Sequence, residues 1–136
     1  MPDIPSTING VTVDFASAVK RNVVQGVIDA LRHVIRPDVA PGHALARIFV
    51  SSARRQASNT SRHNVGKAVD ISRINGVRMS TGFGSDPQVT AIVRAIQQRF
   101  ESFPAKRENF GPSVKLKEGA PFQVAGHGDH IHLSVD

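Results

Sequence analysis

Residues 67–79 constrain the fold most, because they have the sequence of a β-hairpin. Residues 68–74 read AVDISRI, Asn75-Gly76 follows, and residues 77–79 read VRM. Asn-Gly between two β-forming stretches is the preferred sequence of a type I′ turn, in which both central residues take positive φ. The segment therefore predicts two antiparallel strands, with Asp70 on the first.

Two other segments have the spacing of apolar residues that a buried helical face requires. Residues 15–36 carry valine, leucine and isoleucine at steps of three and four, which predicts a long helix capped near Asp14 and stopped by Pro37. Residues 86–103 repeat this spacing behind Asp86-Pro87, a typical start of a helix.

Further strands are expected at residues 46–51, around residues 122–124 and at residues 130–135, where β-forming residues are enriched. Polar loops are expected at residues 52–64 and 104–121. Two principal helices packed on a small, mainly antiparallel sheet make an α+β fold.

Composition limits both the size of the core and the chemistry. A chain of 136 residues, 40% of them hydrophobic, is long enough for one core, and we expect a single domain over residues 1–136. The chain has no cysteine, so any transition metal must be held by histidine and carboxylate. The net charge of +6 favours an anionic partner, for which nucleic acid and the bacterial cell wall both qualify.

The amino terminus has no basic segment followed by an apolar run, and no stretch reaches the ~18 apolar residues of a membrane span. We therefore expect a protein that is made in the cytoplasm without a signal peptide and does not insert into membranes. We also expect it to be a monomer. If its substrate lies in the cell wall or periplasm, the protein must arrive there after lysis or through a delivery machine.

Two short motifs carry the residue types of a metal site. Residues 61–70 have the form S-x-H-x-x-G-x-A-x-D, and residues 129–132 have the form D-H-x-H. A catalytic zinc ion takes three protein ligands and keeps a fourth position for water. A tight turn at Gly66 would bring His63 back beside Asp70, because glycine accepts a positive φ.

In the second motif, a strand places His130 and His132 on the same face, so that one can bind the metal while the other contacts water or substrate. Zinc lowers the pKa of its water to about 7 and polarises a carbonyl, and a nearby carboxylate must then take the proton. Asp129 is the nearest carboxylate in sequence, provided that the strand begins only at about His130. His127 is the alternative.

The two motifs together resemble the zinc peptidases that include D-Ala-D-Ala carboxypeptidases, D-Ala-D-Ala dipeptidases and phage L-alanyl-D-glutamate endopeptidases. They also resemble the metal site of the hedgehog amino-terminal signalling domain. The resemblance covers residues 46–135 and implies a Zn²⁺ ion bound by His63, Asp70 and His132, with Asp129 as the base. Aspartate in place of the commoner glutamate is most similar to the phage endopeptidase branch.

The resemblance also implies contacts to the substrate. The arginine of the family maps onto Arg54, with Arg55 and Arg62 as neighbouring alternatives, and Ser61 is a second substrate contact that can equally cap the loop. The chain departs from the family in having no Trp or Tyr, although several members place an aromatic residue beside the last ligand.

We therefore expect a zinc peptidase that hydrolyses peptidoglycan stem peptides, with Asp129 relaying the proton and His130 stabilising the oxyanion. An endopeptidase is favoured over a carboxypeptidase or dipeptidase, because the chain is short, basic and without insertions that would enclose a dipeptide. A non-catalytic, hedgehog-like zinc module is the second hypothesis. Nucleic-acid binding is disfavoured, since only 5% of the residues are aromatic and no recognition element is evident.

Overall fold

The computed structural model describes residues 1–56 and 60–136. The helices in these residues are α1 (Gln25–Val34), α2 (Met79–Gly82) and α3 (Pro87–Phe100), together with the 3-10 helix η1 (Arg62–Val65). The strands are β1 (Thr7–Ile8), β2 (Val11–Phe15), β3 (Arg47–Ser52), β4 (Ala68–Ile74), β5 (Val77–Arg78), β6 (Lys106–Phe110), β7 (Lys115–Lys117), β8 (Ala120–Pro121) and β9 (Ile131–Val135).

The strands form one mainly antiparallel sheet, which confirms the predicted α+β class. Its order is β1-β2-β3-β4-β9-β6-β7-β8, and β5 pairs with β4. Among the described strands, β2 and β3 run parallel and the other neighbours run antiparallel. The sheet therefore brings β4 and β9, which carry the two motifs, into adjacent positions.

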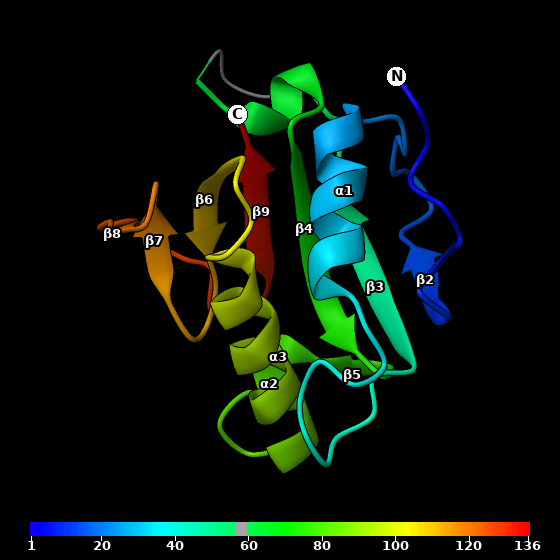
Figure 1. Ribbon diagram of the computed structural model, residues 1–136, viewed down its shortest axis with the longest axis vertical. Coiled ribbons are helices and arrows are strands. Elements are labelled where there is room, and N and C mark those ends of the chain that lie inside the picture. Colours follow the sequence, from blue (N-terminus) through cyan, green and yellow to red (C-terminus); the bar gives the residue numbers. More distant parts are fainter. Residues whose placement is uncertain (57–59) are drawn as a thin grey trace.

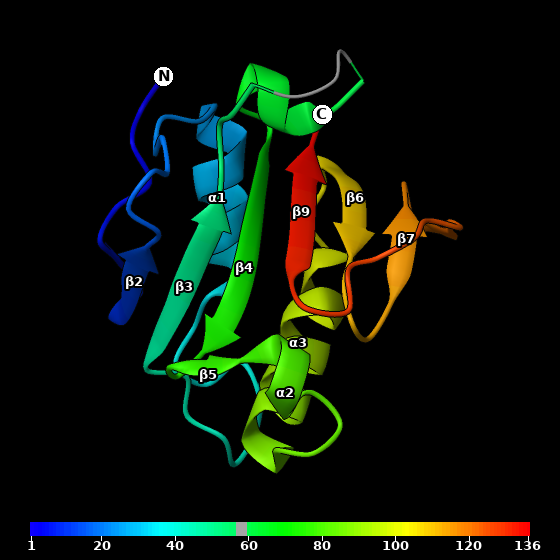
Figure 2. The same ribbon diagram turned by 180° about the vertical axis from the view of Figure 1, so that it is seen from behind.

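Helices α1 and α3 lie on one face of the sheet, in front of β3, β4 and β9 in Figure 1, whereas the view from behind in Figure 2 shows these strands uncovered by the two helices. Alternate residues of a strand point to opposite faces. Ile71 and Leu133 thus point into the buried core beneath the helices, while their neighbours Asp70 and His132 point to the other face. This second face carries the polar site.

The hairpin predicted from Asn75-Gly76 is confirmed. The two residues take φ values of 51° and 81° between β4 and β5, as a type I′ turn requires. The Asn75 side chain adds to the turn, because its Oδ1 accepts hydrogen bonds from the backbone N–H groups of Ala46 and Arg47, at 2.7 and 3.1 Å. The turn therefore also fixes the start of β3.

Of the two predicted helices, the second is confirmed and the first is too long. Helix α3 begins behind Asp86, whose Oδ1 accepts hydrogen bonds from the backbone N–H groups of Gln88 and Val89. Helix α1 begins only at Gln25, and Asp14 is not its cap but lies in β2. The reason is that β2 pairs in parallel with β3, which buries Val13 in the sheet.

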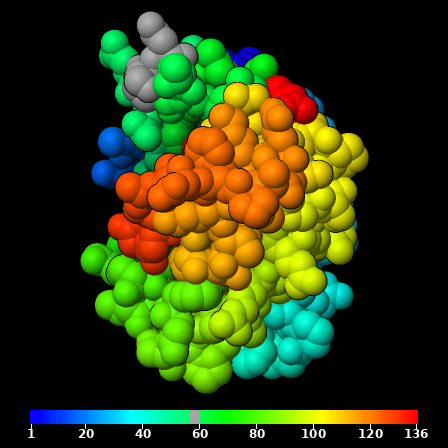
Figure 3. All heavy atoms as spheres, turned by 90° about the vertical axis from the view of Figure 1, so that its left-hand side faces the viewer, coloured from blue at the N-terminus to red at the C-terminus, as the bar shows by residue number. Residues whose placement is uncertain are grey.

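The strand predictions are correct for β3 and β9 but wrong for the segment between α3 and β9. The predicted loop at residues 104–121 contains β6, β7 and β8, and the strand expected at residues 122–124 is not formed. Figure 3 shows the β7–β8 segment (orange) spread over this side of the molecule. The charged residues of this segment hide the alternation of apolar residues by which strands are predicted, because strands near the edge of a sheet keep polar side chains in solvent.

The loop after β3 and the lengths of the helices differ in how fully they are described. Of the predicted polar loop at residues 52–64, residues 57–59 lie outside the described part of the chain, and η1 occupies the end. The longest helix, α3, has 14 residues, and no helix in the described residues combines the length and hydropathy needed to cross a membrane.

Candidate metal centre

Two of the three predicted ligands face each other across adjacent strands. Asp70 of β4 is the register partner of His132 of β9, and both side chains are largely buried. Side chains at directly opposite positions of antiparallel strands have Cβ atoms about 4.5–5.5 Å apart. The pairing of β4 with β9 therefore places two of the three ligands side by side.

The third ligand, His63, reaches the site because the chain reverses at Gly66. His63 lies in η1, and Gly66 ends this turn with φ of 72°, donating its N–H to the carbonyl of His63. The predicted glycine turn is thus confirmed. Strand β4 begins two residues after Gly66, at Ala68. His63 is therefore folded back over Asp70, and only 2% of its surface is exposed.

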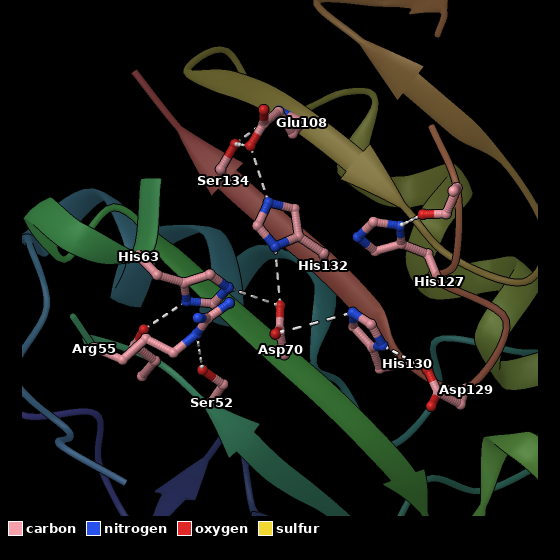
Figure 4. A network of polar contacts seen from close by, with 12 residues as sticks. Ser52, Arg55, His63, Asp70, Glu108, His127, Asp129, His130, His132 and Ser134 are labelled. Atoms are coloured by element: carbon pink, nitrogen blue, oxygen red, sulfur yellow. Dashed lines mark hydrogen bonds and ion pairs between the residues drawn. The ribbon is translucent and has the colours of Figure 1, made fainter. Parts of the chain in front are cut away.

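The three side chains form a group that can hold a metal ion (Figure 4). His63 Nε2 lies 3.1 Å from Asp70 Oδ1, His132 Nδ1 lies 2.9 Å from the same oxygen, and the three ligand atoms lie within 4.8 Å of one another. Ligand atoms bound at about 2.0–2.1 Å in a tetrahedral site lie about 3.3 Å apart. The two separations that involve Asp70 Oδ1 are already close to this value, so the three atoms could share one ion after local adjustment of the side chains.

The hydrogen bonds of His63 identify the ring nitrogen that is free to bind a cation. Its Nδ1 lies 2.5 Å from the carbonyl oxygen of Ala53, and because a carbonyl can only accept, Nδ1 is the donor. In the neutral ring, Nε2 then presents a lone pair to Asp70 Oδ1, which is also an acceptor. A cation between these two atoms satisfies both of them.

Both ring nitrogens of His132 face carboxylates, because Nε2 lies 2.9 Å from Glu108 Oε1. Burial lowers the pKa of His132, but hydrogen bonds to Asp70 and Glu108 outweigh burial and raise this pKa to about 9. Burial raises the pKa of Asp70, yet hydrogen bonds from His132 and His63 hold it well below its usual range. The site therefore attracts positive charge, which a metal ion can supply in place of a ring proton.

A pocket of about 340 Å³ opens over the three ligands, and it contains one of the two predicted substrate contacts. Ser61 lines this pocket at the start of η1, where its side chain makes no capping hydrogen bond to the described residues. Arg54 lines a neighbouring pocket of about 360 Å³, together with Lys20. Arg55, one of the alternatives, lines both pockets.

Of the two residues predicted for proton transfer, His130 lies in the metal pocket and Asp129 lies outside it. Strand β9 begins at Ile131, so Asp129 precedes it, and the Asp129 side chain is 70% exposed. Its Oδ1 accepts a hydrogen bond of 2.7 Å from His130 Nδ1, and His130 Nε2 lies 3.9 Å from Asp70 Oδ2. His130 lines the metal pocket, whereas Asp129 lines a separate depression.

His127, the alternative proton acceptor, also lines the metal pocket. Its ring centroid lies 4.8 Å from that of His130. Burial, followed by the nearby charge of His130, lowers the pKa of His127. The neutral form of His127 is thus favoured by its surroundings.

Sequence reasoning missed two residues of the site, Glu108 and Phe110, because it missed β6. Phe110 is the register partner of His132, and the two rings stack with centroids 5.6 Å apart and planes 16° apart. Phe110 therefore supplies an aromatic contact to the last ligand in a chain without Trp or Tyr. The sequence of β6, Lys-Arg-Glu-Asn-Phe, contains one apolar residue and no polar/apolar alternation, so it gives no strand signal.

Comparisons of the chain with protein-family models, with curated proteins and with solved structures found no significant match.

Proposed function

We propose that the protein is a zinc-dependent peptidase that hydrolyses stem peptides of bacterial peptidoglycan. One observation carries the proposal: two histidines and one aspartate converge beneath an open pocket whose walls contain two further histidines and two arginines. Three protein ligands with an accessible fourth side are typical of catalytic rather than structural zinc sites. The two motifs from which these ligands come are those that resemble the cell-wall zinc peptidases.

The donor set fits zinc. Imidazole nitrogen and carboxylate oxygen are common zinc ligands. A chain that has no cysteine can therefore still form a zinc site from histidine and aspartate. His63 Nε2, Asp70 Oδ1 and His132 Nδ1 would hold the ion. When bound, zinc supplies an acidified water and polarises the carbonyl of the scissile bond.

Proton transfer is assigned to the pair formed by His130 and Asp129. Because His130 Nδ1 donates to Asp129, the neutral ring keeps its lone pair on Nε2, and His130 is the member of the pair that lines the pocket. His130 Nε2 takes the proton of the attacking water and returns it to the leaving amine, while Asp129 orients the ring. This assignment differs from the expectation that Asp129 itself is the base.

Charge favours an acidic peptide as the substrate. Stem peptides carry free carboxylates, and Arg55 stands between the metal pocket and the neighbouring pocket that Arg54 and Lys20 line. Arg55 Nε donates to Ser52 Oγ at 3.0 Å, which holds the guanidinium in place. A substrate bound across the metal would place a carboxylate within reach of this arginine.

The test is digestion of purified peptidoglycan and of soluble muropeptides by the zinc-loaded protein, with products identified by mass spectrometry. We expect new amino termini within the stem peptide, no product with Asp70→Asn, and full activity with His43→Ala as the matched control outside the site. Release of free D-Ala alone would indicate a carboxypeptidase. Zinc binding without cleavage of any peptide bond would contradict the proposal and favour a non-catalytic metal module.

A further inference from the structure

We infer that Glu108 is a positioning residue that holds the ring of His132 with Nδ1 turned toward the metal. The inference rests on the metal site proposed above and adds a residue of β6, a strand outside both motifs. Glu108 lines the metal pocket but does not belong to the three-ligand group, and the ligand that it contacts is His132, through Nε2 on the far side of the ring from Asp70. It therefore acts through His132.

The contacts of Glu108 fix its carboxylate. Oε1 accepts hydrogen bonds from His132 Nε2 at 2.9 Å and from Ser134 Oγ at 2.8 Å. The backbone N–H of Glu108 donates to Ser134 Oγ at 3.0 Å, which closes a small ring of hydrogen bonds between β6 and β9. Figure 4 shows Glu108, Ser134 and His132 meeting on the same side of β9.

The strand that carries Glu108 is anchored from the other face. Asn109, the next residue, is 1% exposed, and its Nδ2 donates to the carbonyl of Gln97 in α3 at 2.8 Å. Gln97 Nε2 in turn donates to Asn109 Oδ1 at 3.0 Å. Because neighbouring side chains of a strand point in opposite directions, this buried pair directs Glu108 and Phe110 toward the metal pocket.

These contacts decide which nitrogen of His132 can bind the metal. A histidine that ligates through Nδ1 must keep its proton on Nε2, and that proton needs an acceptor. Glu108 supplies a charged acceptor, and the stacked ring of Phe110 limits rotation of the imidazole. Hydrogen bonds of this kind orient metal ligands and raise their basicity, and their loss typically costs 10–100-fold in metal affinity.

The experiment measures zinc affinity of the full chain by competition with a chelator, and the visible spectrum of the Co²⁺-loaded protein as a readout of ligand geometry. We expect Glu108→Ala to bind zinc about 10–100-fold more weakly with an altered cobalt spectrum. Glu108→Gln keeps an acceptor oxygen and should recover most of this loss. The matched control is Glu118→Ala, which removes an exposed carboxylate that pairs with Arg107 and not with His132.

Wild-type affinity in Glu108→Ala, or equal weakening in Glu108→Ala and Glu108→Gln, would overturn the inference. Circular dichroism of the metal-free variants shows whether each variant is folded. If Glu108→Ala is unfolded, the zinc affinity of Glu108→Gln still tests the inference. Failure of the proposed function gives a different result. A wild-type protein that binds zinc tightly but cleaves no peptide contradicts the peptidase while leaving the role of Glu108 measurable by affinity.

Discussion

Zinc binding should be steeply dependent on pH, because the metal competes with a proton for His132 Nδ1. In the metal-free protein the pKa of His132 is raised to about 9, since hydrogen bonds to Asp70 and Glu108 outweigh burial. The ring is therefore doubly protonated at pH 7. A metal ion must displace the Nδ1 proton. Below pH 9, the free-energy cost of removing this proton falls as the pH rises.

The magnitude follows from this pKa. Displacement of one proton makes the apparent zinc affinity rise about tenfold per pH unit below the pKa of the metal-free site, or about 100-fold between pH 6.5 and 8.5. This corresponds to about 2.7 kcal/mol of binding free energy. The raised pKa also stabilises the metal-free fold, fully below pH 6.5 and progressively less as the pH rises through 9, by at most about 3 kcal/mol.

Isothermal titration calorimetry in buffers of different ionisation enthalpy measures the number of protons released per zinc ion. We expect at least one proton at pH 7, and chelator competition should give a slope of at least one in log affinity against pH. Urea unfolding should show the metal-free protein less stable at pH 9 than at pH 6.5. A pH-independent affinity with no proton release would refute the reasoning.

Three further predictions concern the pocket and the hairpin. His130→Ala should lower kcat about 100-fold or more with zinc still bound. Asp129→Asn should lower kcat less, because Asp129 acts through His130. An equal or larger loss of kcat in Asp129→Asn would contradict this order. Arg55→Ala should raise KM about tenfold with kcat nearly unchanged, and Arg54→Ala should raise it less, as steady-state kinetics on a muropeptide will show. Asn75→Ala should lower the free energy of unfolding by about 2 kcal/mol without loss of zinc, because it removes the hydrogen bonds to the start of β3 at a residue with φ of 51°.

His63 and Asp70 could be brought together from the sequence because their geometry is local, whereas the choice of His132 over His130 as the third ligand came from the resemblance to the zinc peptidases. Asn75-Gly76 sets the hairpin that contains Asp70, and Gly66 returns His63 to it within a few residues. His132 needed one long-range step, the pairing of β9 with β4. The β pattern of both segments predicts two strands of one sheet, but it does not predict that these strands are neighbours.

The rest of the site could not be predicted, because it depends on contacts between strands with weak patterns. Glu108 reaches His132 only through the pairing of β6 with β9, and the charged sequence of β6 resembles a loop. Asp14 is a second example. The helical spacing predicts that Asp14 caps a helix, whereas the parallel pairing of β2 with β3 places it in a strand. Spacing within a segment cannot reveal its neighbour in a sheet.

The central claim is that one cation binds between His63 Nε2, Asp70 Oδ1 and His132 Nδ1. Anomalous diffraction at the zinc absorption edge, from crystals of the protein grown with zinc, locates the ion directly. We predict a single strong peak about 2.0–2.2 Å from each of these three atoms. A peak elsewhere, or no peak among the three side chains in a zinc-loaded crystal, would contradict the account.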